Sequence, residues 1–321
     1  MRRPSSGRLL KFLGASVVLL LSAHVLLSSV SKDGAEPRPA GSAKEQRRLL
    51  PPLPYRYLVN QAGLCRDRTP FLVFMVPVAP RDAAAREAVR KTWGAPSQDT
   101  LTLFFTGLPV MGERRSLQEE LEQESRLYAD IIQVDFMDSY QNLTLKTLMM
   151  MKWLGAHCSN ASFAMKVDAD IFVNVFHLRD RLRTSPRLGF ITGSVIRDGR
   201  PRRDPWSKWY LSKELYPEDS FPPYVSGAGY VFSLDLAGRI FWASRYVQVI
   251  PLEDVYVGLC LRVLGVRPVY SRSMLFLRNL FEIQNLKYDR CTFAKLVIVN
   301  KFKPSELLQV WPDFLEGHAR C

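Results

Sequence analysis

The sequence lacks the closely spaced cysteines of zinc and redox motifs, because its five cysteines include no Cys-x-x-Cys pair. It has only one long run without charged residues, which excludes a multi-pass membrane protein. Acidic residues are few beside basic ones, 31 Asp and Glu against 44 Lys and Arg. The resulting net charge of +13 indicates an anionic partner, and nucleic acid, a membrane surface and a phosphorylated small molecule all fit it.

The rest of the composition is that of a folded protein. Hydrophobic residues make up 47% and charged residues 23% of the 321 residues, so the chain can bury a core and is not disordered throughout. We see no internal repeat. Five cysteines allow up to two disulfides with one cysteine left over.

The N-terminus predicts a membrane anchor. Residues 1–11 are basic without an acid, and residues 12–30 carry no Asp, Glu, Lys or Arg. As a helix, 19 residues would span roughly 28 Å, enough for a thin bilayer, with the basic flank in the cytosol. A cleaved signal peptide is the alternative, although its apolar region is usually shorter. Residues 31–54 are rich in Pro, Ala and charge and read as a stem, and residues 55–321 as one lumenal domain.

Alternating apolar runs and helical patterns predict an α/β fold with a mostly parallel sheet flanked by helices. We expect strands at 71–77, 101–106, 131–136 and 163–167, and helices at 113–128 and 143–157. We also expect a helix that Asp82 caps and that continues to about Trp93, and an apolar helix that follows Glu253 and Asp254 and continues through Leu264 to Gly265. Ligands bind beyond the carboxyl ends of the strands in such sheets. Asp168 directly follows the fourth strand, so we expect it at this edge.

Asp168 and Asp170 are two carboxylates at positions i and i+2 after a buried strand. Like charges this close raise each other's pKa unless a cation lies beside them. Mg²⁺ and Mn²⁺ prefer oxygen ligands and bind substrate phosphates, so this pair can hold a nucleotide diphosphate through a metal. A solvated turn is the alternative reading.

Three further segments carry candidate functional residues. Glu253 and Asp254 stand at the start of an apolar helix. Either both acids stabilise the helix through its dipole, or Asp254 is a general base held at the helix start. The segment 226–229 (Ser-Gly-Ala-Gly) precedes a strand-like run and reads as a turn or as a close approach of backbone to ligand. Arg86 and Arg90 share one helix face, from which they face water or reach phosphates.

Two sequons, at Asn142 and Asn160, agree with a lumenal location. Either one, taken alone, is a triplet that chance produces often.

Taken in order, these motifs resemble the β-1,3-galactosyltransferases and β-1,3-N-acetylglucosaminyltransferases, which are Golgi type II membrane enzymes. The resemblance covers the whole region 55–321. Its motifs are Arg86-Glu-Ala-Val-Arg90-Lys-Thr-Trp93-Gly94, Asp130 to Phe136, Asp138 to Thr147, Lys166-Val-Asp168-Ala-Asp170 with Phe172-Val-Asn174, Lys208-Trp209-Tyr210, Pro222-Pro-Tyr224 with Ser226-Gly-Ala-Gly229-Tyr230, and Glu253-Asp254-Val-Tyr-Val-Gly258.

The resemblance implies a GT-A-type fold, a UDP-sugar donor and a divalent metal, Mn²⁺ or Mg²⁺. It implies Asp170 as the metal ligand, Asp168 at the nucleotide ribose or a metal-bound water, and Asp254 as the catalytic base. It further implies nucleotide-sugar contacts and a donor and acceptor pocket. The nucleotide-sugar residues are Arg86, Arg90, Asp168 and Lys166, and the pocket residues are Trp209, Gly227, Gly229, Tyr230 and Glu253.

Ala169, at the centre of the acidic triplet, favours the galactosyl branch with UDP-galactose, and UDP-N-acetylglucosamine is the alternative donor. The resemblance implies as acceptor a terminal sugar on a glycoprotein or glycolipid. Asn300 stands where relatives often carry His, so we expect the metal to be held more weakly or to receive an amide oxygen there. A catalytically weak binding or chaperone module is therefore a further alternative. We expect no nucleic-acid partner, because the basic residues are dispersed apart from 197–203.

Overall fold

The computed structural model describes residues 50, 51, 53–66, 68–109, 114–270 and 286–321, which belong to one compact unit. The predicted tail at 1–11, the predicted membrane span at 12–30 and nearly all of the stem at 31–54 lie outside the described residues. Across the part that is described, no helix is both long and apolar enough to cross a bilayer.

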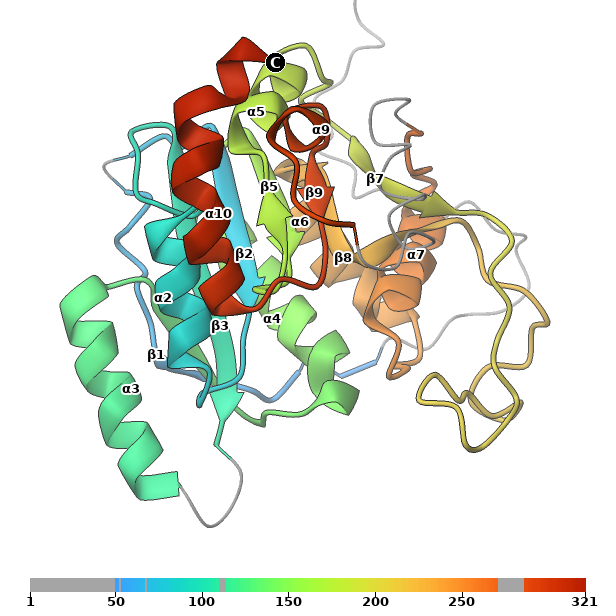
Figure 1. Ribbon diagram of the computed structural model, residues 1–321. Coiled ribbons are helices and arrows are strands. Elements are labelled where there is room, and N and C mark those ends of the chain that lie inside the picture. The colour runs from blue at the N-terminus through green and yellow to red at the C-terminus, as the bar shows by residue number, and fades with distance from the viewer. Residues whose placement is uncertain (1–49, 52, 67, 110–113, 271–285) are drawn as a thin grey trace, which may run out of the picture. The chain divides into compact units, whose positions relative to one another are not determined.

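The predicted alternation of strands and helices is confirmed (Figure 1). The strands are β1 (Tyr57–Val59), β2 (Leu72–Pro77), β3 (Thr100–Leu108), β4 (Ile131–Met137), β5 (Phe163–Val167), β6 (Phe172–Val173), β7 (Ile191–Ile196), β8 (Tyr224–Ser233) and β9 (Ile298–Val299). The α-helices are α2 (Ala83–Lys91), α3 (Arg114–Tyr128), α4 (Leu143–His157), α5 (Val175–Arg183), α6 (Asp235–Ala243), α7 (Glu253–Leu264), α9 (Arg290–Ala294) and α10 (Pro304–Gly317). Short 3₁₀ turns lie at Tyr140–Asn142, Ser244–Tyr246 and His318–Arg320.

The main sheet of the described region has the order β1-β4-β3-β2-β5-β8-β7. Its four central strands, β4, β3, β2 and β5, run parallel, and β1, β8 and β7 add to the two sides antiparallel. The prediction of a mostly parallel sheet therefore holds for the centre. Because β8 runs opposite to β5, the start of β8 lies beside the carboxyl end of β5.

Both faces of the sheet are covered, which is why β2 is buried throughout and reads as a continuous apolar run. Val73 and Met75 point into a core shared with α4, α6 and α7. Leu72, Phe74 and Val76 point into the other core, with α2 and α10. Figure 1 shows α10 lying along α2 on this second face.

The segment 226–229 is a correction. We expected Ser-Gly-Ala-Gly as a turn before a strand, but it lies inside β8, which pairs through Val167↔Gly229 and Lys166↔Tyr230. The physical reason is that β5 supplies a hydrogen-bonding partner for this backbone. A prediction from the local sequence alone cannot include a partner that is distant in the chain. The glycines thus bring the β8 backbone close to the end of β5.

Candidate active site

The acidic triplet sits where β5 leaves the sheet. The Asp168 N–H donates to the Ala228 carbonyl of β8 at 3.2 Å, so pairing with β8 continues into the triplet. The Asp168 side chain is 41% exposed. Asp170 is exposed, although neighbouring protein atoms partly desolvate its carboxyl group. This partial desolvation and the charge of Asp168 together raise the pKa of Asp170.

Asp254 lies in the first turn of α7 and is oriented by two backbone donors. Gly227 N–H donates to Oδ2 at 3.1 Å and Val255 N–H donates to Oδ1 at 2.8 Å. Burial raises the pKa of Asp254, and these two bonds oppose the shift. A Cβ on Gly227 would lie 3.0 Å from Glu253 Oε2, so a larger residue would require the Glu253 side chain to shift. The carboxylate is therefore fixed against β8.

A single ammonium group joins these two acidic segments. Lys166 Nζ lies 2.7 Å from Asp168 Oδ1 and 3.6 Å from Glu253 Oε2, and it also donates to the Gly227 carbonyl. Burial alone would lower the pKa of Lys166, but the charges of Asp168 and Glu253 outweigh it and raise that pKa. Motifs that are about 60 to 90 positions apart in the sequence thus meet at one point.

A cavity of about 400 Å³ opens beside Asp168 at the carboxyl edge of the parallel strands. Its wall includes a buried ion pair that the sequence reading did not assign. Lys146 Nζ lies 2.9 and 2.8 Å from the two carboxylate oxygens of Asp138 and donates to the Val78 carbonyl at 3.1 Å. Arg81, also in the wall, keeps a solvent-exposed guanidinium. The signal for Asp138 was its position directly after a strand.

The sequence comparisons agree with this geometry. Residues 84–272 match the protein family described as Galactosyltransferase. The chain belongs to the galactosyltransferase family. Beta-1,3-galactosyltransferase 1 of Homo sapiens is 40% identical over 285 residues, covering 85% of this chain and 83% of that protein. Beta-1,3-galactosyltransferase 2 of Homo sapiens is 38% identical over 275 residues, covering 83% and 64%. The predicted family resemblance and the prediction of a glycosyltransferase enzyme are confirmed.

A solved structure, the apo form of the bifunctional glycosyltransferase WbbM, aligns over 80% of this chain and 51% of its own at a TM-score of 0.40 and 10% identity. That likeness is too distant to assign the fold of this galactosyltransferase to a subclass.

The acidic triplet of this galactosyltransferase contains two carboxylates, Asp168 and Asp170. No group of three or more His, Cys, Asp and Glu side chains within the described ranges is arranged to hold a metal. Asp168 and Asp170 nevertheless fit Mg²⁺ or Mn²⁺, which take their remaining ligands from water and phosphate. Desolvation and the negative charge of Asp168 raise the pKa of Asp170, and a bound cation would favour its ionised form.

Asn300 lies beside the turn that contains Asp170. The residues on either side of Asn300 show this: Val299 of β9 pairs with Phe172 of β6, and the Phe302 N–H donates to the Asp170 carbonyl at 2.9 Å. The structure therefore puts Asn300 next to the acidic triplet, where the family resemblance expects a histidine. Whether its amide serves the metal stays a prediction.

Gly229 and Tyr230 belong to β8 and pair with the last two residues of β5, directly before Asp168. A Cβ on Gly229 would meet Ile298 Cδ1 at 3.1 Å, and Tyr230 is fully buried with its hydroxyl donating to Glu253 Oε1 at 2.7 Å. These residues therefore shape the site from the inside. Burial raises the pKa of both Tyr230 and Glu253.

Trp209 is 46% exposed on the β7–β8 connection. The Lys208 ammonium lies 4.6 Å from the centre of the Trp209 ring and 5.8 Å from the centre of the Tyr140 ring. Tyr140 lines the cavity, so the Lys208 ammonium links Trp209 to a residue of the cavity wall.

The structure does not bring Arg86 and Arg90 to the acidic triplet. Arg86 is 1% exposed; it pairs with Glu124 and donates to the carbonyls of Ala79 and Pro80. Arg90 pairs with Glu124 and Asp130. Arg86 therefore braces the cavity wall through the 79–80 backbone rather than offering a free guanidinium to phosphate.

We expect Arg86→Met to lower the free energy of unfolding by about 3 kcal/mol, because the change breaks a buried guanidinium's pairing with Glu124, whose side chain is 15% exposed and keeps Arg90 as its other partner. Urea unfolding measures this loss. Arg81→Met removes an exposed guanidinium and should cost about 0.5 kcal/mol or less. Equal losses for the two variants would contradict the bracing role of Arg86.

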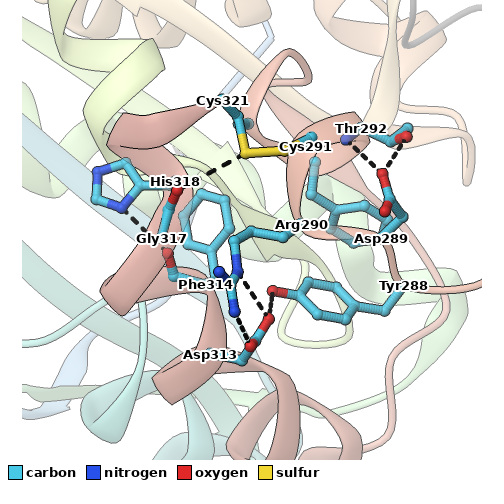
Figure 2. Close-up of a disulfide and its surroundings, with 12 residues drawn as sticks. Tyr288, Asp289, Arg290, Cys291, Thr292, Asp313, Phe314, Gly317, His318 and Cys321 are labelled. Atoms are coloured by element: carbon cyan, nitrogen blue, oxygen red, sulfur yellow. Dashed lines mark hydrogen bonds and ion pairs between the residues drawn. A yellow bond between two sulfur atoms is a disulfide. The ribbon is translucent and has the colours of Figure 1, made fainter.

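The cysteines form two disulfides, Cys65–Cys158 and Cys291–Cys321, and leave Cys260 buried and free, as the count predicted. Figure 2 shows the second disulfide joining α9 to the C-terminal residue, with Tyr288 and Arg290 both bonded to Asp313 of α10. The loop that this disulfide closes contains β9 and Phe302, which hold the Asp170 turn.

Replacing Cys291 and Cys321 together by Ser should lower the stability by about 2–4 kcal/mol through the freed loop. It should also weaken Mn²⁺-dependent UDP binding, because β9 and Phe302 contact the Asp170 turn. Thermal melting and calorimetry measure the two effects. Unchanged UDP affinity in the folded double variant would show that the turn does not depend on this clamp.

The asparagines of the two sequons differ in the number of hydrogen bonds that their side-chain amides donate. Asn142 donates from its amide to the Met137 carbonyl at 2.8 Å. Asn160 uses both amide hydrogens, toward the carbonyls of Cys65 and Arg68. A glycan leaves an asparagine one N–H, so modification of Asn160 would remove one of its bonds. Use of either sequon stays a prediction.

Proposed function

We propose that this galactosyltransferase moves galactose from UDP-galactose to the 3-hydroxyl of a terminal sugar on a glycoprotein or glycolipid, with inversion at the anomeric carbon. The relatives named beta-1,3-galactosyltransferase support the donor and the linkage. One observation carries the proposal. Asp168 and Asp254 meet at Gly227, the first through Lys166 and the second through the Gly227 N–H.

The nucleotide of the donor would lie in the cavity beside Asp168, whose volume suits a small ligand. Asp170 and Asp168 would hold Mn²⁺ or Mg²⁺, with Asp168 reaching the ribose or a metal-bound water. When bound, the ion supplies positive charge against the departing diphosphate. Arg81, whose exposed guanidinium lies 4.0 Å from an Asp82 carboxylate oxygen, adds a positive charge at the same wall.

Asp254 would act as the general base. Its two backbone donors hold the carboxylate in one orientation, and its raised pKa makes it a better proton acceptor than an ordinary aspartate. It would take the proton of the acceptor 3-hydroxyl while that oxygen attacks the anomeric carbon. One in-line displacement of an α-linked donor yields the β product, and holding both sugars in line lowers the barrier further.

The proposal includes a GT-A-type fold and a Golgi type II membrane protein anchored by residues 12–30, with stem 31–54 and lumenal domain 55–321. The parallel centre of the sheet, with carboxylates at its carboxyl edge, supports the fold assignment. The uncharged run after a basic flank supports the anchor.

A donor comparison tests the proposal. Full-length protein in detergent with Mn²⁺ is given UDP-galactose or UDP-N-acetylglucosamine and acceptors ending in GlcNAc, GalNAc or Gal. We expect galactose transfer to at least one acceptor. Transfer of N-acetylglucosamine alone would establish the alternative donor, and neither hydrolysis nor transfer would favour a binding or chaperone module.

A further inference from the structure

Four carboxylates from two elements gather around one buried cation. Asp168 and Asp170 follow β5, and Glu253 and Asp254 begin α7. The Lys166 side chain, on β5, is 3% exposed and lies between the two pairs. A lysine buried this deeply is retained only where its partners offset the loss of hydration.

The ammonium of Lys166 has three hydrogens and three protein partners: Asp168 Oδ1, the Gly227 carbonyl and Glu253 Oε2. Two of these contacts are hydrogen bonds, and the Glu253 contact at 3.6 Å is an ion pair beyond hydrogen-bond distance. Because the Lys166 side chain is 3% exposed and surrounded by these protein oxygens, the contacts favour a positioning role over the nucleotide-sugar contact that the family resemblance implied.

We propose that Lys166 is a positioning residue that fixes the proposed base, Asp254, relative to the proposed metal and nucleotide side at Asp168. This inference rests on the proposed function. The connection runs through Gly227, whose carbonyl accepts from Lys166 while its N–H donates to Asp254 Oδ2. The carbonyl of Gly227 thus connects to the Asp168 side of the site through Lys166, and its N–H connects to Asp254.

A second connection runs through Glu253. One of its oxygens faces Lys166 at 3.6 Å, and the other accepts from the Tyr230 hydroxyl at 2.7 Å. Glu253 is 8% exposed and immediately precedes Asp254 in the first turn of α7. The start of α7 is therefore held to β5 and to β8 at the same place, and the Asp254 backbone has little freedom to move.

Lys166→Met tests the proposal, because Met keeps the length of the side chain and removes its charge and donors. With full-length protein and saturating Mn²⁺, we expect kcat to fall by about 100-fold, as for a small misplacement of a reacting group. The KM for UDP-galactose should change less than about threefold, because Lys166 does not contact the donor. A rise in KM with kcat preserved would instead show direct donor binding and overturn the proposal, as would unchanged kinetics.

Tyr230→Phe keeps the proposal testable if Lys166→Met does not fold. It removes only the hydroxyl that donates to Glu253, so kcat should fall by about fivefold with KM unchanged. An unchanged kcat in folded Tyr230→Phe would contradict the connection through Glu253. These results are ratios to wild type, whereas failure of the proposed function would appear as wild-type protein without transfer.

Discussion

Asp254→Asn should reduce galactose transfer by about 10²–10⁴-fold while Mn²⁺-dependent UDP binding survives, because the change removes the proton acceptor and leaves the nucleotide side intact. Both carboxylate oxygens of Asp254 accept backbone hydrogen bonds, from Gly227 and Val255. An amide has only one oxygen, so Asn keeps one of these bonds. The local geometry should therefore shift only slightly.

The measurement compares initial transfer rates with UDP affinity from calorimetry on the same preparation. Asp180→Asn is the matched control, because Asp180 is a 76% exposed carboxylate on α5. It should transfer galactose at the wild-type rate. Turnover of Asp254→Asn comparable to wild type would remove Asp254 as the base, and simultaneous loss of UDP binding would indicate a general collapse of the site.

Asp170→Ala should weaken Mn²⁺-dependent UDP binding by roughly 100-fold or more, since even outer-shell partners of a metal contribute 10–100-fold. The backbone bond from Phe302 to the Asp170 carbonyl does not involve the side chain, so the turn should keep its shape. The excess negative charge beside Asp168 also falls, so the stability should not drop.

Calorimetry of UDP binding with Mn²⁺ and with EDTA separates the metal-dependent part of the UDP affinity from the metal-independent part. Wild type should bind UDP tightly only with Mn²⁺, and Asp170→Ala should show nearly the same weak affinity in both conditions. An affinity for UDP that is independent of metal in wild-type protein would contradict the assignment of Asp170 and Asp168 as metal ligands.

The sequence predicted the parts of the fold that depend on local pattern. Strand β5 and helix α4 were predicted with the observed bounds, because each is a mostly apolar segment. The apolar helix predicted after Glu253 and Asp254, continuing through Leu264 to Gly265, is observed as α7 (Glu253–Leu264). The position of Asp168 at the edge followed from the end of β5. The same reasoning placed Asp254 at a helix start.

What the sequence did not predict depends on partners distant in the chain. Gly227 lies within a strand because β5 pairs with β8, and nothing near Gly227 signals this. Arg86 is buried because Glu124, 38 residues away, accepts its guanidinium hydrogens. A helical i, i+4 pattern with Arg90 cannot tell a buried ion-pair network from an exposed basic face. Lys166 is a similar case, since its partners Gly227 and Glu253 come from other elements.

The most direct test of the central claim is the structure of the product. Full-length protein, Mn²⁺, UDP-galactose and the acceptor that it uses best should yield a disaccharide whose linkage NMR can determine. The account predicts a new galactose in the β configuration on the 3-hydroxyl. An α linkage, a different hydroxyl, or free galactose as the sole product would contradict it.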